Sequence, residues 1–292
     1  MKPGRFKVGI IGAGRVGPVI GRALQIVGHE VIGITRSSKP ERNDAAEAIL
    51  GAPFVEAEEA CEADLVLIAI PDDQIQPLVD GLAKLGCFRP GQIVMHTSGA
   101  HGIRVLDSAQ AAGALPIALH PAMTFTGTSI DVDRLQMCPA AITSTAVALP
   151  IASAIALEIG LEPRVVEEED RTLYHGALAH GANHLVTLVT QAVEMLDRAG
   201  VENPALYIRP LLNAALDRAL SEGASGLTGP VRRGDTGTLQ AHRRALFEAD
   251  MPVALETYTD LARATAKMAG EHLLLTENQV SEILASLRPK QG

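Results

Sequence analysis

The chain has 292 residues, of which 47% are hydrophobic and 20% are charged. This length and composition predict two folded domains of ordinary size and exclude an intrinsically disordered chain. The net charge of −9 and the aromatic content of only 3% argue against a nucleic-acid partner, which requires basic and stacking side chains.

The first half of the chain alternates short apolar runs with helical stretches. Residues 64–70 (DLVLIAI) are apolar throughout, which is typical of a parallel strand buried on both faces. Residues 18–28 read as a helix, as does a stretch rich in Ala and Ile between the last two strands. This alternation predicts an α/β fold with a doubly wound parallel sheet. The predicted strands cover residues 7–11, 30–34, 64–70, 92–96, 115–119, 140–143 and 163–166.

The second half of the chain has no convincing strand. A boundary near residue 168, within an acidic run, therefore separates a predicted sheet domain (1–168) from a predicted all-helical domain (169–292). The helical domain is expected to carry the substrate site and the dimer contacts. Its predicted helices cover residues 171–199, 204–222, 236–249, 252–270 and 277–287.

A GxGxxG sequence, Gly12-Ala13-Gly14-Arg15-Val16-Gly17, follows the first predicted strand and opens the first predicted helix. Glycines at this spacing allow a tight turn, the approach of a pyrophosphate to the backbone, and close packing of helix on strand. The phosphates then meet free N–H groups at the positive end of the helix. The motif predicts dinucleotide binding, and the alternative is a purely structural glycine turn.

The end of the second predicted strand favours NADP over NAD. NAD-binding folds usually carry an acidic residue here, whereas this chain has Arg36, Ser37 and Ser38. Arg36 can stack on adenine and pair with a 2′-phosphate, and the serines can donate hydrogen bonds to it. The alternative is a solvated basic loop.

The turn after residues 64–70 is a second candidate for cofactor contact. Ile70 and Pro71 are expected to line the nicotinamide side of the site. Asp72 and Asp73 are interpreted first as caps of the following helix.

The chain carries five further motifs: HTSG (96–99), LHPAMTF (119–125), Tyr174-His175 with Asn183, LTGP (227–230) and RGD (233–235). With these motifs it resembles the Rossmann-like/DUF2520 proteins of the 6-phosphogluconate dehydrogenase-like superfamily, which includes pyrroline-5-carboxylate, hydroxyisobutyrate and ketopantoate enzymes. The resemblance implies NADP- or NAD-dependent hydride transfer and a homodimer built through the helical domain, with ketopantoate as one specific candidate substrate.

The chain departs from this family at one catalytic position. Hydroxy-acid members carry Lys-x-x-x-Asn on the first helix of the second domain, with the lysine as general acid. If Asn183 is that asparagine, the lysine position is Ala179, and no lysine lies on this helix. The lysine mechanism therefore cannot be transferred to this chain.

Helical geometry suggests what could replace the lysine. At about 100° per residue, His180 and Asn183 share a polar stripe with Thr187, Thr190, Gln191 and Glu194. This stripe is either a solvent-exposed face or a cleft-facing one, on which Asn183 would bind substrate or the nicotinamide carboxamide.

Three further residues are candidates for handling a proton or a substrate oxygen. His175 has a pKa range suited to proton donation, and the alternative is a histidine packed at a hinge. His120 and Ser98 end predicted strands at the carboxyl edge, where doubly wound sheets bind ligands.

The loop around Arg233 is a candidate for substrate binding. Arg233 and Thr228 are expected to bind a substrate carboxylate, because the guanidinium of arginine can donate two parallel hydrogen bonds to a carboxylate. The alternative is a helix-capping turn with Asp235 or Thr236 as the N-cap.

A metal site is not expected. His180 and His184 are spaced i, i+4, but the sequence HGANH lacks the glutamate of an HExxH zinc site, and His184 points away from His175.

The sequence therefore favours an NADP-dependent reductase of a small carbonyl acid. The alternatives are an imine reductase and a dinucleotide-binding regulatory protein without catalysis. No apolar run approaches about 18 residues, and residues 1–9 lack the features of a signal peptide. Together with three scattered cysteines, these features predict a cytoplasmic protein with no membrane contact.

Overall fold

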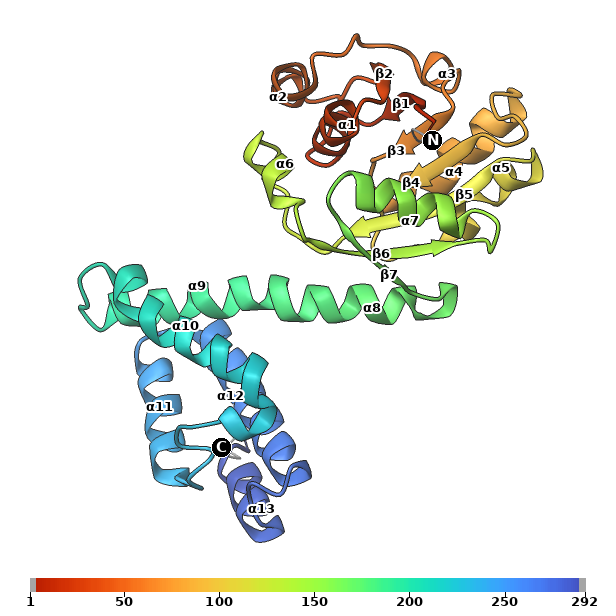
Figure 1. The fold of residues 1–292 in the computed structure, drawn as a ribbon. Helices are drawn as coiled ribbons and strands as arrows, with labels where there is room; N and C mark the ends of the chain where they lie inside the picture. The colour runs from red at the N-terminus through yellow and green to blue at the C-terminus, as the bar shows by residue number, and fades with distance from the viewer. Residues whose placement is uncertain (1–3, 289–292) are drawn as a thin grey trace. The chain divides into compact units, whose positions relative to one another are not determined.

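Seven strands form one sheet in the first half of the chain, as Figure 1 shows for the computed structural model, which describes residues 4–288. The strand order is β2-β1-β3-β4-β5-β6-β7. The strands are β1 (Lys7–Ile11), β2 (Glu30–Ile34), β3 (Leu65–Ile68), β4 (Ile93–His96), β5 (Leu115–Pro121), β6 (Pro139–Ser144) and β7 (Glu162–Val165).

The α/β prediction is confirmed, with one departure from an all-parallel sheet. All pairings are parallel except that of β5 with β6, in which His120 lies opposite Ala141. The reversed strands are β6 and the edge strand β7, which run parallel to each other, and mixed sheets of this kind are common. The alternation of apolar residues reports burial but not strand direction, and so this reversal was not predicted.

Helices cover both faces of the sheet because successive side chains of its strands point to opposite faces. On β3, Leu65 and Leu67 pack into one hydrophobic cluster, and Val66 and Ile68 pack into another. The first cluster includes α1 (Gly17–Ile26), α2 (Pro40–Leu50), α6 (Ile130–Arg134) and α7 (Leu149–Glu158). The second includes α3 (Ala57–Ala60), α4 (Asp72–Lys84) and α5 (Asp107–Ala111).

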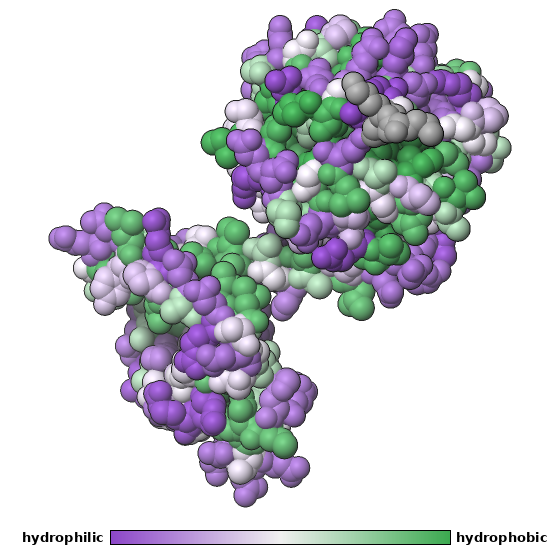
Figure 2. Space-filling view, in the orientation of Figure 1, coloured by the Kyte–Doolittle hydropathy of each residue, from purple (hydrophilic) through white to green (hydrophobic). Residues whose placement is uncertain are grey.

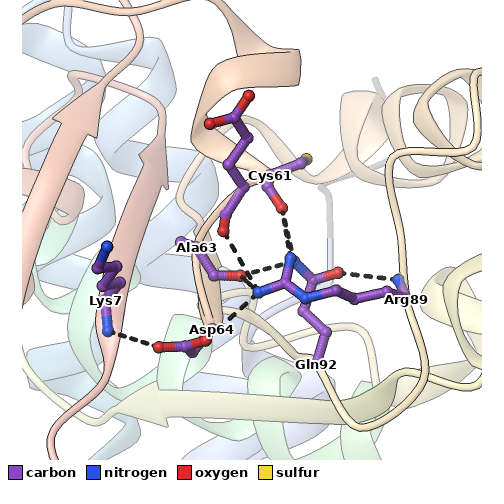
Figure 3. Close-up of polar contacts among 7 residues, drawn as sticks. Lys7, Cys61, Ala63, Asp64, Arg89 and Gln92 are labelled. Atoms are coloured by element: carbon purple, nitrogen blue, oxygen red, sulfur yellow. Dashed lines mark hydrogen bonds and ion pairs between the residues drawn. The ribbon is translucent and has the colours of Figure 1, made fainter.

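The amino ends of β1, β3 and β4 are held together by a polar cluster (Figure 3). Gln92 Nε2 donates to the carbonyl oxygens of Cys61 and Ala63 at 2.7 and 2.8 Å. Arg89 donates to the Ala63 carbonyl at 2.8 Å and to the Asp64 carboxylate at 3.3 Å. These bonds satisfy backbone carbonyls at the edge of the sheet opposite to the glycine-rich turn, and they are structural.

The chain divides into two compact units, Met1–Ala182 and Asn183–Gly292. The helix α8 (Arg171–Leu178) belongs to the first unit, although it follows the boundary predicted near residue 168. A π-helical turn, Ala179–Asn183, connects it to α9 (His184–Arg198). The second unit continues with α10 (Pro204–Glu222), α11 (Thr236–Glu248), α12 (Pro252–Glu271) and α13 (Glu277–Ser286).

The second unit has its own hydrophobic core. Leu239 of α11, Ala266 of α12 and Ile283 of α13 are fully buried in it. Within residues 4–288, no helix combines the length and the apolar character that a membrane crossing requires.

Candidate active site

The glycine-rich turn joins β1 to α1, at the point where the strand order of the sheet reverses. Gly12 has a φ of +118°, and a Cβ there would lie 2.3 Å from the Ala69 carbonyl oxygen. A Cβ on Gly17 would lie 2.3 Å from the Gly12 carbonyl oxygen. The turn itself therefore requires both glycines. Gly14 differs, because a Cβ there would meet only the Ala69 oxygen, at an ordinary 3.7 Å.

The geometry of this turn fits a diphosphate. No side chain caps the N-terminus of α1 at Val16, so its first N–H groups lack a side-chain partner. The Gly12 N–H donates instead to Thr35 Oγ1 at 3.0 Å, which ties the turn to the end of β2. Ala13 is buried and Arg15 is exposed. The open space at Gly14 is the side from which a ligand can approach the backbone.

The end of β2 carries a stacked arginine. The Arg36 guanidinium carbon lies 4.1 Å from the ring centroid of Phe54, a residue that pairs with Ile34 in an isolated parallel bridge. The backbone of Ser37 is fixed by Asn43, which accepts from Ser37 N at 2.7 Å and donates to Ser37 O at 3.0 Å. Ser38 is exposed. The loop thus holds a cation with one face on Phe54, in a form suited to a base and a phosphate.

The turn after β3 differs from its prediction in one respect. Ile70 is half-buried, and its Cγ2 lies 3.0 Å from the Cβ position of Gly12, so it borders the glycine-rich turn. Pro71 is the N-cap of α4 and is exposed. The prediction that Asp72 and Asp73 cap this helix is wrong, because both lie within its first turn and no side-chain cap forms. Their charges there favour the helix dipole.

Ser98 shapes the loop that follows β4. Its side chain is buried, and its Oγ accepts from the backbone N–H groups of Ala100 and His101 at 3.2 and 3.1 Å. His96 supports the same loop, because its Nδ1 accepts from Ser98 N and its Nε2 therefore donates to Gly102 O. Burial lowers the pKa of His96 to about 4, which keeps the ring neutral.

His120, at the end of β5, forms a cluster with two residues of α8. Its Nδ1 lies 2.9 Å from Tyr174 Oη, and its ring meets that of His175 edge-on at 6.2 Å between centroids. Gly99 packs against both imidazoles, since a Cβ there would lie 2.7 Å from His175 Cδ2 and 2.9 Å from His120 Nε2. The structure therefore brings two sequence-predicted residues, His120 and His175, together at the carboxyl edge.

Arg171 lies beneath this cluster and is 1% exposed. Its guanidinium donates to Thr143 Oγ1 at 2.7 Å and to the carbonyl oxygens of Ser98, Ala118 and Ala141 at 3.3, 2.8 and 3.2 Å. Burial, and then the charge of Arg171, lower the pKa of His120 to about 4. His120 is therefore a neutral imidazole near pH 7.

Three predicted substrate residues lie in the second unit. Asn183 ends the π-helical turn and is exposed, as are Thr228 and Arg233. The neighbouring residue Arg232 is held in place by a hydrogen bond, which its guanidinium donates to Leu274 O at 2.8 Å. The capping interpretation of this loop is confirmed, because Asp235 is the N-cap of α11 and accepts from Thr238 N at 3.0 Å.

The predicted polar stripe holds only in part. His180 and Asn183 lie within the π-helical turn, whose wider repeat does not keep the α-helical spacing of 100°. Thr187, Thr190 and Glu194 lie on α9 and are exposed. Gln191 is buried and donates to Thr257 Oγ1 at 3.1 Å, so it belongs to the core of the second unit. The described part of the chain contains no group of three or more His, Cys, Asp or Glu side chains that could hold a metal ion.

Sequence reasoning missed three residues of these sites. Arg171 and Phe54 were not identified, and Tyr174 was noted only as part of a family motif. The adjacent Tyr174-His175 pair was the available signal for Tyr174. Nothing local in the sequence marks Arg171, whose partners lie 28 to 73 residues away along the chain.

Two family models match successive parts of the chain. The Rossmann-like domain family matches residues 1–121, and DUF2520, a domain of unknown function, matches residues 138–265. No curated protein matches the chain in sequence.

Solved structures share the fold across most of their length. A candidate NADP oxidoreductase from Bacteroides fragilis is 20% identical with a TM-score of 0.75, and the match covers 89% of this chain and 98% of that one. An imine reductase from Myxococcus stipitatus in complex with NADP+ is 16% identical with a TM-score of 0.65, covering 89% and 94%. A pyrroline-5-carboxylate reductase from Coxiella burnetii is 16% identical with a TM-score of 0.55, covering 88% and 99%. The chain thus combines a Rossmann-like region at its N-terminal end with a DUF2520 region, whose match begins before β6 of the sheet and continues into the helices of the second unit.

Proposed function

We propose that this protein is an NADP-dependent reductase of a small carbonyl or imine compound. The observation that carries the proposal is the meeting of two features at one edge of the sheet: an open, uncapped glycine-rich turn and a half-buried His120–Tyr174 pair. Doubly wound sheets bind their ligands at this edge. The names of the structural neighbours, which include NADP and imine reductases, support the same class of reaction.

The geometry of the first unit supports one set of cofactor-binding residues. The turn from Gly12 to Gly17 would hold the pyrophosphate, Arg36 with Ser37 and Ser38 the adenosine 2′-phosphate, and Ile70 with Pro71 the nicotinamide side. When bound, the reduced nicotinamide supplies a hydride. The protein supplies position, an environment that excludes water, and a proton where the substrate needs one.

Two substrate classes are consistent with this chemistry. A small 2-keto acid such as ketopantoate is one, and a cyclic imine, the class suggested by the neighbours' names, is the other. Asn183, Thr228 and Arg233 remain the predicted substrate residues of the second unit, with Arg233 suited to a carboxylate.

The helical unit supports the further proposal of a homodimer. None of the described residues of α10 is buried, although Leu206, Leu211 and Leu220 are among them and are 61%, 68% and 79% exposed. Figure 2 shows hydrophobic residues on the surface of this unit. A helix with this many exposed large apolar side chains usually packs against a partner. Cys61, Cys87 and Cys138 are free thiols, which is in keeping with a reducing compartment such as the cytoplasm.

A Gly14→Ala variant tests cofactor binding without disturbing the fold. The added methyl group would meet no protein atom closer than 3.7 Å, but it would occupy the side from which a diphosphate approaches. We expect unchanged thermal stability and at least a tenfold loss of NADPH affinity by calorimetry. Gly81→Ala is the matched control, because nothing lies within 4 Å of a Cβ at Gly81.

The wild-type protein should also oxidise NADPH with at least one member of a panel of 2-keto acids, ketones and cyclic imines. Binding of NADPH without turnover of any of them would instead favour a regulatory dinucleotide-binding protein. Unchanged NADPH affinity in Gly14→Ala would contradict the assignment of the turn.

A further inference from the structure

The buried guanidinium of Arg171 is bonded to neutral groups. Within residues 4–288, its four hydrogen bonds reach three carbonyl oxygens and one hydroxyl. Among the described residues, no carboxylate lies within ion-pair distance of it. Glu168 acts on it only at longer range, and its carboxylate is already bound by the Ile103 N–H at 2.6 Å. Charges that are buried without a partner are rare, because removing them from water is costly.

The positive field of this cation acts on the His120–Tyr174 pair. The Arg171 guanidinium carbon lies 6.0 Å from the centroid of the Tyr174 ring. The guanidinium is the strongest charge acting on His120, ahead of His175 and of Asp72, the carboxylate that opposes it. Arg171 is 1% exposed, and its hydrogen bonds reach Thr143 Oγ1 and three backbone carbonyl oxygens, so it does not bind a substrate directly. It acts through the His120–Tyr174 pair.

This field distinguishes the two substrate classes left open above. Hydride addition to a carbonyl group creates negative charge on oxygen, which a buried cation stabilises and which then requires a proton. An iminium ion is itself a cation, and hydride addition removes its charge and requires no proton. A site with a buried guanidinium beneath it therefore favours the carbonyl and opposes the iminium.

The pair also offers a proton at the right place. Tyr174 Oη is half-buried and lies in hydrogen-bond contact with His120 Nδ1. A neutral imidazole can return a proton to the phenol from solvent after turnover. His120 in its cationic form is not available near pH 7, so the phenol is the better acid of the two.

We infer that the substrate of this site is a carbonyl compound, that Tyr174 is the catalytic acid, and that Arg171 is a positioning residue whose charge favours the developing alkoxide. The inference rests on the proposed reductase function. Hydride adds to the carbonyl carbon, the C=O π pair moves to oxygen, and that oxygen takes the Tyr174 Oη proton. The tyrosinate then regains a proton from solvent through His120.

A matched pair of substrates tests this inference. Cyclopentanone and 1-pyrroline are both five-membered rings, of which the first presents an exocyclic C=O group and the second a C=N bond within the ring. Short 2-keto acids extend the carbonyl set. We expect carbonyl substrates to show the higher kcat/KM. Tyr174→Phe should lower their kcat/KM by about 100-fold or more, the usual contribution of a general acid, and leave the residual imine rate within about threefold.

The chain provides its own control for the tyrosine variant. Tyr258 Oη lies 2.8 Å from His242 Nδ1, and the two ring centroids are 5.7 Å apart. This geometry closely matches that of the His120–Tyr174 pair, but Tyr258 and His242 both belong to the second unit. Tyr258→Phe should leave all rates unchanged. A loss equal to that of Tyr174→Phe would mean that the tyrosine variants act through general stability, and it would overturn the inference.

The role of Arg171 is tested by variants that keep or remove its charge, and by ligand binding as well as by turnover. Arg171→Lys, which keeps the charge, should retain more carbonyl activity than Arg171→Met, and the kcat–pH profile of Arg171→Met should shift as the pKa of His120 rises. Calorimetry with NADP+ present should show binding of a 2-hydroxy acid or cyclopentanol but not of pyrrolidinium. If the arginine variants do not fold, the Tyr174→Phe rates and the ligand-binding results still test the inferred substrate class and catalytic acid.

Two results would overturn the inference while leaving the reductase function intact: faster reduction of 1-pyrroline than of every carbonyl, or undiminished carbonyl reduction by Tyr174→Phe. A wild-type protein that binds no NADPH would instead overturn the proposed function itself.

Discussion

Replacing Arg36 with alanine tests the predicted preference for NADP at a single side chain. A hydrogen bond between charged groups contributes about 1.5–3 kcal/mol, and Arg36 is exposed, so the lower end applies. A loss of about 1.5 kcal/mol corresponds to roughly a tenfold weaker Kd for NADP+. NAD+, which lacks the 2′-phosphate, should lose only the contact of its adenine with the guanidinium. The ratio of NAD+ to NADP+ dissociation constants should therefore fall.

The stack of Arg36 on Phe54 allows a second, finer step. At 4.1 Å the contact is a cation–π interaction, which at exposed sites contributes about 0.5–1 kcal/mol. Phe54→Leu should therefore weaken NADP+ binding by about two- to fivefold, because the Arg36 guanidinium is then no longer held in place before the cofactor binds. Since Phe54 acts through Arg36, the double variant should bind NADP+ no more weakly than Arg36→Ala alone.

Calorimetric titration with NADP+, NAD+ and 2′,5′-ADP measures the effects of Arg36→Ala, of Phe54→Leu and of the double variant. Arg22→Ala is a suitable control, because Arg22 is an exposed arginine of the same unit that bonds only to Gln25 among its described contacts. The reasoning is refuted if NAD+ binds the wild-type protein as tightly as NADP+ does. It is also refuted if Phe54→Leu weakens NADP+ and NAD+ binding equally.

Three further predictions follow from burial and packing. Because the pKa values of His96 and His120 lie near 4 when folded and near 6.5 when unfolded, the unfolded chain binds more protons between these values, and urea titrations should show stability falling as pH drops from about 6.5 to 4. Gly99→Ala should displace both imidazoles, costing about 1–3 kcal/mol of stability and most of the activity. Sedimentation should show a dimer that Leu211→Glu dissociates, and a wild-type monomer at micromolar concentration would contradict this.

Much of the fold was predictable because it depends on local patterns. The bounds of β1 and β2 agree with the sequence prediction because short apolar runs mark buried strands. Those of α10 agree because Pro204 at its start and Gly223 after its end are typical limits of a helix. The π-helical turn at 179–183 could not be predicted in this way. Its stretch AHGAN is compatible with an ordinary helix, and the extra residue per turn appears only when the helix is built.

The candidate site was predictable at positions next to the end of a strand, and not where a residue contacts several elements distant in sequence. The glycine-rich turn, Arg36 and His120 each stand at the end of a strand, so their place at the carboxyl edge follows from strand order alone. Arg171 is different, because its four acceptors come from β5, β6 and the loop after β4. Such a residue reads in sequence as an ordinary charged start of a helix.

The glycines of the turn show how packing and ligand binding can be told apart. Gly12 and Gly17 are fixed by the protein itself, since a side chain at either position would collide with backbone at 2.3 Å. Their presence is therefore explained without any ligand. Gly14 meets nothing within that range, and the fold alone would accept alanine there. The position that the fold leaves unconstrained is thus the one that points to a bound diphosphate, and it is where substitution should separate binding from folding.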